Sequence, residues 1–391
     1  MKNEHPCLRA PKLDLLKNER LSKSKKNTTP FNRRGVPSPG SLNPNLKAQL
    51  SNRKKIDLDE IIQKIMAGDR VYLSKAITLI ESKNPKHQAL AQQILKACMS
   101  KAGKSLRIGI TGSPGVGKST FIEYFGSHLI EQGHQVAVLA IDPSSQISRG
   151  SILGDKTRMG ELAKQAKAFI RPSPAGESLG GVARKTRETI ILCEAAGFDR
   201  ILIETVGVGQ SEIAVHSMTD FFLLLLLPGA GDELQGIKRG IVEMADMIAV
   251  NKADGDRLQL AQQAKRAYLN ALHLFPPKES NWIPPVDLCS AYEKRGIETI
   301  SEHIHAFFKQ VNKNGFFKKN RQQQARYWLH ESIQQQLRQQ FYQHPDIQQA
   351  LEKVEEEVSA ERLSSFQAAE QLLAIFKATR PEQDTDPTES R

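Results

Sequence analysis

The chain has little cysteine, few aromatic residues and no long apolar run. Its four cysteines, Cys7, Cys98, Cys193 and Cys289, lie far apart and form no C-x-x-C pair, which argues against a disulfide framework and a zinc site. A reducing compartment therefore fits best, with Cys193 and Cys289 as small core residues. No stretch approaches the ~18 consecutive apolar residues of a membrane span. The most apolar run, 221–227, has the length of a buried strand.

The start of the chain also lacks recognisable targeting features. It has no apolar stretch typical of a secretory signal, and the acidic residues Glu4, Asp14 and Glu19 count against a mitochondrial transit peptide. We therefore expect a cytoplasmic protein, with the mitochondrial matrix as the alternative.

Most of the chain lacks an excess of charge, although the formal net charge is +12. Residues 1–55 hold 14 Lys and Arg against 3 Asp and Glu, and so carry +11 of it. The rest of the chain is nearly neutral, which argues against a nucleic-acid-binding domain. The composition of residues 1–55 predicts a disordered tail. A solvated extension is one interpretation, and electrostatic contact with a membrane surface, nucleic acid or an acidic partner is the alternative.

Apolar spacing predicts three further regions. Residues 56–103 have helical periodicity, residues 104–312 alternate strands and helices, and residues 320–380 hold two or three amphipathic helices that Pro345 interrupts. These last helices are too few for a core of their own, so we expect them to pack on the main domain or on another copy. The central alternation predicts an α/β fold with a mostly parallel sheet. The expected strands are 106–111, 136–141, 168–172, 200–204, 219–227, 246–250 and 285–289, and the expected helices are 118–131, 180–196, 233–244, 256–273 and 296–311.

A phosphate-binding loop follows the first expected strand. The segment G-S-P-G-V-G-K-S fills every fixed position of the pattern G-x-x-x-x-G-K-[ST], between an apolar run and a helical segment. Its glycines let backbone N–H groups face the phosphates, Lys118 reaches the β- and γ-phosphates, and the Ser119 hydroxyl binds Mg²⁺. The expected nucleotide contacts are Gly112, Ser113, Pro114, Gly115, Val116, Gly117, Lys118, Ser119 and Thr120.

A guanine-reading motif, Asn251-Lys252-Ala253-Asp254, follows the strand expected at 246–250. The Asp254 carboxylate can accept hydrogen bonds from the ring N1–H and the exocyclic amine of guanine, which adenine does not present. An unpaired buried acceptor is costly, so such a site can discriminate by roughly 10⁴ or more. The motif alone is weak, because Asn and Asp are common at turns. After a full phosphate loop, it favours GTP and GDP over ATP.

Several segments between the two motifs can supply metal ligands. Asp142 follows an expected strand and either reaches Mg²⁺ or only forms an Asp-Pro turn. Glu204 stands at another strand end, where a P-loop protein holds its Mg²⁺ water, and Gly207 can donate its N–H to the γ-phosphate. Gln210 could orient the attacking water, although it lies beyond the usual position. Asp232 could be part of a functional loop or only cap the next helix.

Together these motifs resemble the MeaB (ArgK) family of GTPases. The resemblance rests on G-S-P-G-V-G-K-S, D-P-S-S, E-T-V-G-V-G-Q-S-E, G-D-E-L-Q-G-I-K and N-K-A-D in this order, and it covers about residues 56–380. It implies a P-loop GTPase domain over 104–312, a helical N-terminal region and a homodimer built partly through the C-terminal helices. It also implies a chaperone of an adenosylcobalamin-dependent acyl-CoA mutase, most often methylmalonyl-CoA mutase. Such a chaperone gates cofactor loading and helps remove damaged cofactor.

The resemblance also implies residue roles. It gives Ser119, Asp142, Asp155 and Glu204 as metal and switch ligands. With the roles argued above for Lys118 and Gln210, the expected catalytic set is Lys118, Asp155, Glu204 and Gln210. It gives Asp232 and Lys238 to a third switch loop that couples the nucleotide to the mutase. Ser290 and Ala291 provide the short backbone contact to guanine, and we add Tyr292 beside them. Arg149, Arg158 and Arg184 are candidates for a catalytic arginine.

Two other functions remain alternatives. A P-loop kinase or transport ATPase requires ATP preference, against which N-K-A-D argues. A metal-delivery GTPase requires a His-rich tract or a Cys/His cluster, whereas the ten histidines here are scattered.

Overall fold

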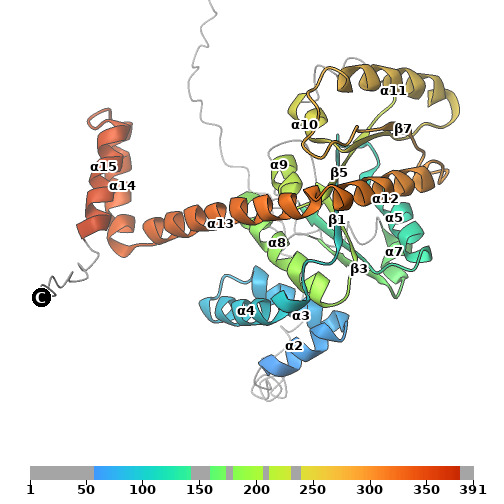
Figure 1. Ribbon diagram of the computed structural model, residues 1–391. Helices are drawn as coiled ribbons and strands as arrows, with labels where there is room; N and C mark the ends of the chain where they lie inside the picture. Colours follow the sequence, from blue (N-terminus) through green and yellow to red (C-terminus); the bar gives the residue numbers. More distant parts are fainter. Residues whose placement is uncertain (1–56, 142–158, 173–178, 206–210, 230–238, 379–391) are drawn as a thin grey trace, which may run out of the picture. The chain divides into compact units, whose positions relative to one another are not determined.

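Figure 1 shows a computed structural model, which describes residues 57–141, 159–172, 179–205, 211–229 and 239–378. An N-terminal group of helices precedes the sheet, a second group lies between the strands with its last helix after the final strand, and three further helices end the described chain. The first group is α2 (Leu58–Met66), α3 (Arg70–Glu81), α4 (Pro85–Cys98) and the 3₁₀ turn η1 (Met99–Lys101). The second is α5 (Lys118–Glu131), α7 (Gly160–Lys164), α8 (Leu179–Ala195), α9 (Ser211–His216), α10 (Arg239–Met244), η3 (Gly255–Arg257), α11 (Leu258–Leu272) and α12 (Ile297–Lys313). The third is α13 (Phe316–Tyr342), α14 (Pro345–Ser359) and α15 (Ser365–Ala378).

Within the described residues, seven strands form one sheet in the order β3-β2-β4-β1-β5-β6-β7, and every pair of neighbours is parallel. This confirms the predicted α/β class and places the strands' carboxyl ends at one edge, where ligands bind in such folds. The strands are β1 (Leu106–Gly112), β2 (Val136–Ile141), β3 (Ala168–Arg171), β4 (Arg200–Thr205), β5 (Phe221–Leu226), β6 (Met247–Val250) and β7 (Val286–Leu288).

Alternate residues of the strands point to opposite faces of the sheet, and helices cover both faces. In β5, Phe221 and Leu223 pack with α5 and α12, whereas Phe222 packs with α8 and α9 and Leu224 with α11. Both faces of the strand are therefore buried, which explains the uninterrupted apolar sequence of 221–226.

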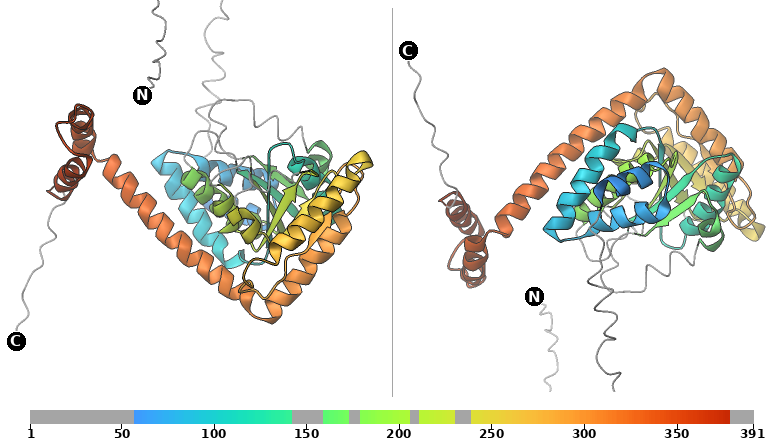
Figure 2. Two further views of the ribbon diagram at one scale, coloured as in Figure 1. Left: turned by 90° about the horizontal axis from the view of Figure 1, so that it is seen from above. Right: turned by 90° about the horizontal axis from the view of Figure 1, so that it is seen from below.

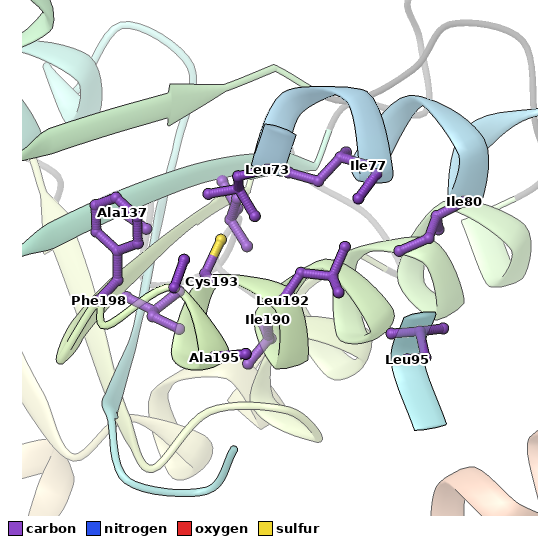
Figure 3. Close-up of a cluster of buried hydrophobic side chains, with 14 of the residues drawn as sticks. Leu73, Ile77, Ile80, Leu95, Ala137, Ile190, Leu192, Cys193, Ala195 and Phe198 are labelled. Atoms are coloured by element: carbon purple, nitrogen blue, oxygen red, sulfur yellow. The ribbon is translucent and has the colours of Figure 1, made fainter. Parts of the chain in front are cut away.

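The N-terminal helices belong to the same core. Their apolar side chains pack against α8, with β2, β4 and β5 behind it, in a single cluster that includes Leu73, Ile77, Ile80 and Leu95 (Figure 3). Side-chain caps define the start of each helix: Asp57, Asp69 and Asn84 each accept hydrogen bonds from the first turn. The helical prediction for this region is confirmed in residues 58–101.

The C-terminal helices differ from the expectation. Helix α13 begins at Phe316, just after a turn at Gly315 that separates it from α12 (Figure 2). Pro345 starts α14, as predicted for a helix breaker. The two last helices, however, do have a small core of their own, formed by Ile347, Val354, Ala368 and Leu372. Two short amphipathic helices can bury such a cluster by packing antiparallel, which the sequence argument overlooked.

Cysteine placement matches the sequence interpretation: Cys98, Cys193 and Cys289 are free and buried. Among the helices that the structure describes, none combines the length and apolarity of a membrane-spanning segment.

Candidate functional site: the carboxyl edge of the sheet

The phosphate loop joins β1 to α5 at the carboxyl edge of the sheet. Gly112 and Gly117 have positive φ angles of 150° and 94°. A Cβ at Gly112 would overlap the Leu225 carbonyl oxygen, and one at Gly117 would lie 2.9 Å from Asn251 Nδ2. Glycine is therefore required at both positions by conformation and by space. The loop ends at the N-terminus of α5, where free backbone N–H groups favour an anion.

Lys118 lies inside this loop and is only 8% exposed. Its ammonium donates to the carbonyl oxygens of Gly112 (2.7 Å) and Ser113 (3.2 Å). Burial lowers the pKa of Lys118, while the carboxylates of Glu204 and Glu212 oppose that shift. The loop thus holds a desolvated cation where the phosphates of a nucleotide would lie.

Glu204 and Ser119 come together next to the loop. Glu204 is near the end of β4, is 5% exposed and is paired in register with Ile110 of β1. The Ser119 hydroxyl donates to Glu204 Oε1 at 3.2 Å. The two groups offer hard oxygen atoms, which are the ligands that Mg²⁺ prefers.

The guanine motif contacts the phosphate loop directly. Asn251 Nδ2 donates to the Val116 carbonyl oxygen (2.8 Å), and Asn251 Oδ1 accepts from the Ala291 N–H (3.1 Å). Lys252 has a positive φ of 58°, and its ammonium reaches the Gly115 carbonyl oxygen at 2.7 Å. One buried asparagine therefore joins the phosphate loop to the segment after β7, so the three predicted parts lie next to one another.

Asp254 is held by two neighbours. The Ser290 hydroxyl donates to Asp254 Oδ2 (2.6 Å), and Arg257 Nη2 pairs with Asp254 Oδ1 at 3.1 Å. Arg295 fixes the preceding backbone through the Ala253 carbonyl oxygen (2.7 Å). Tyr292, in contrast, is 85% exposed. These contacts hold the carboxylate in a fixed orientation, as reading the N1–H edge of guanine requires.

Other predicted site residues lie outside the described residues. These are Asp142, Asp155, Gly207, Gln210, Asp232 and Lys238, together with the arginine candidates Arg149 and Arg158. The third arginine candidate, Arg184, pairs with Glu188 at 3.2 Å on α8. In the part of the chain that the structure describes, no three His, Cys, Asp or Glu residues gather in a cluster that could by itself hold a metal ion.

The structure adds residues that the sequence analysis did not assign. Glu212 is 1% exposed and close enough to Lys118 to raise its pKa. Its signal was present, since it ends the motif E-T-V-G-V-G-Q-S-E. Arg257 lies three residues after Asp254, a spacing that brings two side chains together in a helical turn. Thr205 bonds to Thr111 across two strands at 2.9 Å, a contact that depends on strand order.

The fold and the linked phosphate and base motifs define a P-loop protein that binds guanine nucleotides. Residues 73–346 match a family model described as methylmalonyl Co-A mutase-associated GTPase MeaB. The chain belongs to this MeaB family of GTPases.

Individual relatives agree with this assignment. GTPase ArgK of Escherichia coli is 49% identical over 280 residues, which cover 72% of this chain and 85% of that protein. The mouse protein named methylmalonic aciduria type A homolog, mitochondrial, is 44% identical over 339 residues, covering 84% and 82%. A crystal structure titled LAO/AO transport system kinase has a TM-score of 0.66 and 38% identity, and spans 83% of this chain and 100% of that one. The predicted family, fold class and GTPase activity are thereby confirmed.

Proposed function

We propose that this GTPase is a chaperone of an adenosylcobalamin-dependent acyl-CoA mutase, with methylmalonyl-CoA mutase as the first candidate. It would gate loading of the cofactor and help protect the enzyme. The family description names association with that mutase, and the mouse relative carries the name of methylmalonic aciduria. The observation that carries the proposal is the match over 73–346, which includes both the nucleotide site and the beginning of the C-terminal helices.

For the nucleotide site, we propose that Lys118 binds the β- and γ-phosphates and that Ser119 and Glu204 hold Mg²⁺, Glu204 through a water. The spacing of their oxygens, 3.2 Å, supports this assignment. When bound, the metal neutralises charge on the phosphate oxygens. By resemblance, Asp142 and Asp155 complete the metal and switch carboxylates. From their sequence positions after Glu204, Gly207 contacts the γ-phosphate and Gln210 orients water. Asp232 and Lys238 then form the loop that reports to the mutase.

For the base, we propose that Asp254 accepts the N1–H and exocyclic amine of guanine while the stem of Lys252 covers the ring. Ala291 and Tyr292 would contribute through the backbone after β7. Asp254→Asn should shift preference away from GTP, because an amide turns a donor toward the N1–H. A competition assay with labelled GDP tests this. ATP that competes as well as GTP in the unaltered protein would instead support a kinase or transport ATPase.

For assembly, we propose a homodimer built partly through the C-terminal helices. Leu329, Ile333 and Leu337 are about half exposed and repeat every four residues on α13, and Phe366 on α15 is 84% exposed. A second copy would cover such a row. Light scattering of the unaltered protein and of Ile333→Glu tests this, since the charged variant should be monomeric.

The partner itself is tested by GTP hydrolysis. The purified chain should hydrolyse GTP slowly, and adding methylmalonyl-CoA mutase should accelerate the reaction. Lys118→Ala, which removes the phosphate-binding ammonium, is the control for contaminating activity. Hydrolysis that no cobalamin-dependent acyl-CoA mutase changes would reject the chaperone assignment. Stoichiometric binding of nickel or zinc would favour the metal-delivery alternative.

A further inference from the structure

Helix α13 docks on the GTPase domain through one face. Arg321, Gln324 and Trp328 are spaced by three and four residues, which places them on one side of the helix. All three contact residues 217–220, the turn between α9 and β5. The contacts are Trp328 Nε1 to the Ser217 carbonyl oxygen (3.1 Å), Gln324 Nε2 to the Thr219 carbonyl oxygen (2.6 Å) and Arg321 Nη2 to Asp220 Oδ2 (2.6 Å).

This 217–220 turn is the base of α9, the short helix that carries Glu212. Glu212 is buried, and α9 packs against β1 and β4, the strands that lead to the phosphate loop and to Glu204. The Glu212 carboxylate also opposes the lowering of the Lys118 pKa by burial. Ser217 lies five positions after Glu212, which is about 8 Å along a helix. The position of the turn therefore decides where α9 presents this carboxylate.

The side chains beneath α9 are tightly packed. Gly109 of β1 faces both α9 and the turn, and a Cβ there would lie 2.9 Å from Val215 Cγ1 and 3.1 Å from Thr219 Cγ2. Close-packed interiors transmit displacements instead of absorbing them. A shift of the turn must consequently move α9.

A set of four charged side chains also holds the 217–220 turn in position. Arg107 pairs with Glu194 at 2.9 Å, and Arg321 pairs with Asp220, which also accepts the Arg107 N–H at 2.9 Å. The Glu194 and Asp220 side chains are each 1% exposed. Burial alone would raise the pKa of Glu194, but Arg107 and hydrogen bonds bring the pKa below its usual value. Apolar packing in place of a buried ion pair is often equally stable, whereas breaking such a pair is costly, so these pairs hold the two elements in one geometry.

Helix α8 also contacts α13, through Arg187. Arg187 donates to the Gln324 carbonyl oxygen and lies over the Trp328 ring, 5.5 Å from its centroid. Gln324 is 6% exposed, and its Oε1 has no hydrogen-bond partner within the described residues. A buried amide with one unsatisfied atom is a poor means of gaining stability. Stability therefore does not account for this glutamine, and its hydrogen bond to the 217–220 turn points to a role in positioning that turn.

We infer that Gln324 and Trp328 of α13 are positioning residues for GTP hydrolysis, acting through the 217–220 turn and α9 on Glu212 at the phosphate loop. The inference concerns the GTPase reaction alone. It does not depend on the proposed mutase partner, and its assay contains no mutase, so the two can fail separately.

The test uses two mild variants of the full chain, Trp328→Phe and Gln324→Leu, each of which removes one donor to the turn. Loss of one hydrogen bond, about 1 kcal/mol, corresponds to roughly a fivefold fall in kcat if the bond is felt in the transition state. We expect that fall with nearly unchanged GDP affinity and Tm. The matched controls are Tyr327→Phe and Gln322→Leu, which alter exposed positions of the same helix and should leave kcat unchanged.

A double-mutant cycle separates positioning from general damage. In a Glu212→Gln background, Trp328→Phe should have no further effect on kcat, because both changes act through the same group. Independent effects that multiply would overturn the inference, and so would variants with unchanged kcat. Should either variant fold poorly, hydrogen exchange of the unaltered protein decides: protection of 217–220 and 321–328 should change together between GDP and a GTP analogue. Unchanged exchange in 321–328 would also reject the inference.

Discussion

The helices that precede the sheet and those that follow it are attached in different ways. Helices α2, α3 and α4 bury apolar side chains such as Leu73, Ile77 and Ile94 in the same cluster as α8 and the sheet. Helix α13 begins with Phe316 and Phe317, which pack against the domain core, and from Arg321 to Trp328 it attaches mainly through polar and charged contacts. Helices α14 and α15 bury Ile347 and Leu372 in a separate cluster. The first group is part of the GTPase core. In the second group, residues 321–328 of α13 are held by direction-dependent contacts, which suit an element that reports or receives a signal.

The largest expected effect on stability comes from making the same Leu→Ala substitution in each of the two regions. Leu73→Ala removes a fully buried side chain from the shared core and should destabilise the GTPase domain by about 2–5 kcal/mol. Leu372→Ala makes the same change in the small C-terminal cluster and should leave the domain's unfolding midpoint unchanged. Denaturant unfolding followed by tryptophan fluorescence and by GDP binding checks both. Equal losses of domain stability would show that the two regions form one cooperative unit.

A slightly smaller effect comes from the nucleotide. GDP at about one hundred times its Kd should stabilise the domain together with α2–α4 by about 2.7 kcal/mol, because ligand binding favours the folded state. The α14–α15 pair should gain nothing from it. Hydrogen exchange with and without GDP measures the two regions in one experiment. Lys118→Ala should abolish the stabilisation, without lowering the stability of the nucleotide-free protein, because its buried ammonium is costly.

The pH dependence should also differ between the regions. The pKa of Glu194 is lower in the folded protein than in the unfolded chain, so its contribution to stability is present above the unfolded pKa and is lost as pH falls through the folded pKa. Acid should therefore weaken the α8–α13 contact, whereas the apolar α14–α15 cluster responds less. Thermal unfolding between pH 3 and pH 7 tests this, and Glu194→Gln should flatten the acid side of the curve. A steep acid slope that survives in Glu194→Gln would assign the effect to other carboxylates.

The smallest effect is a difference in thiol reactivity. Burial raises the pKa of the Cys98 thiol on α4 to about 11, and the side chain is fully buried. Alkylation at pH 8 should therefore be slow and limited by opening of the core. A cysteine introduced by Ala368→Cys, buried in the α14–α15 cluster, should react faster because that pair opens at lower free energy. Mass spectrometry of the labelled peptides compares the two, and equal rates would contradict the separation.

Much of the fold was accessible from the sequence because long apolar runs and motifs have clear ends. The expected strand 136–141 and helix 118–131 agree with β2 and α5. The short helices α7 and α9 were not predicted, since five or six residues give no periodicity. The C-terminal cluster was missed because residue spacing does not show which helix faces which.

For the candidate site, too, local sequence patterns could be predicted and contacts between distant segments could not. The phosphate loop and the guanine motif are local sequence patterns, and their order in the chain was enough to predict a shared site. The bond between Asn251 and Val116, the pairing of Glu204 with Ser119, and the place of Glu212 all depend on strand order and register. The contact of Trp328 with Ser217 joins residues that lie 111 positions apart, so no local pattern could reveal it.

The attachment of α13 has a consequence for any molecule that holds the C-terminal helices. If α13 helps to set the geometry of the phosphate loop, then GTP and GDP must in turn change how firmly those helices bind such a molecule, because coupling between two sites is reciprocal. A coupling of about 1.4 kcal/mol would make the two affinities differ tenfold. The rate of GTP hydrolysis would then set how long the C-terminal helices hold such a molecule before releasing it.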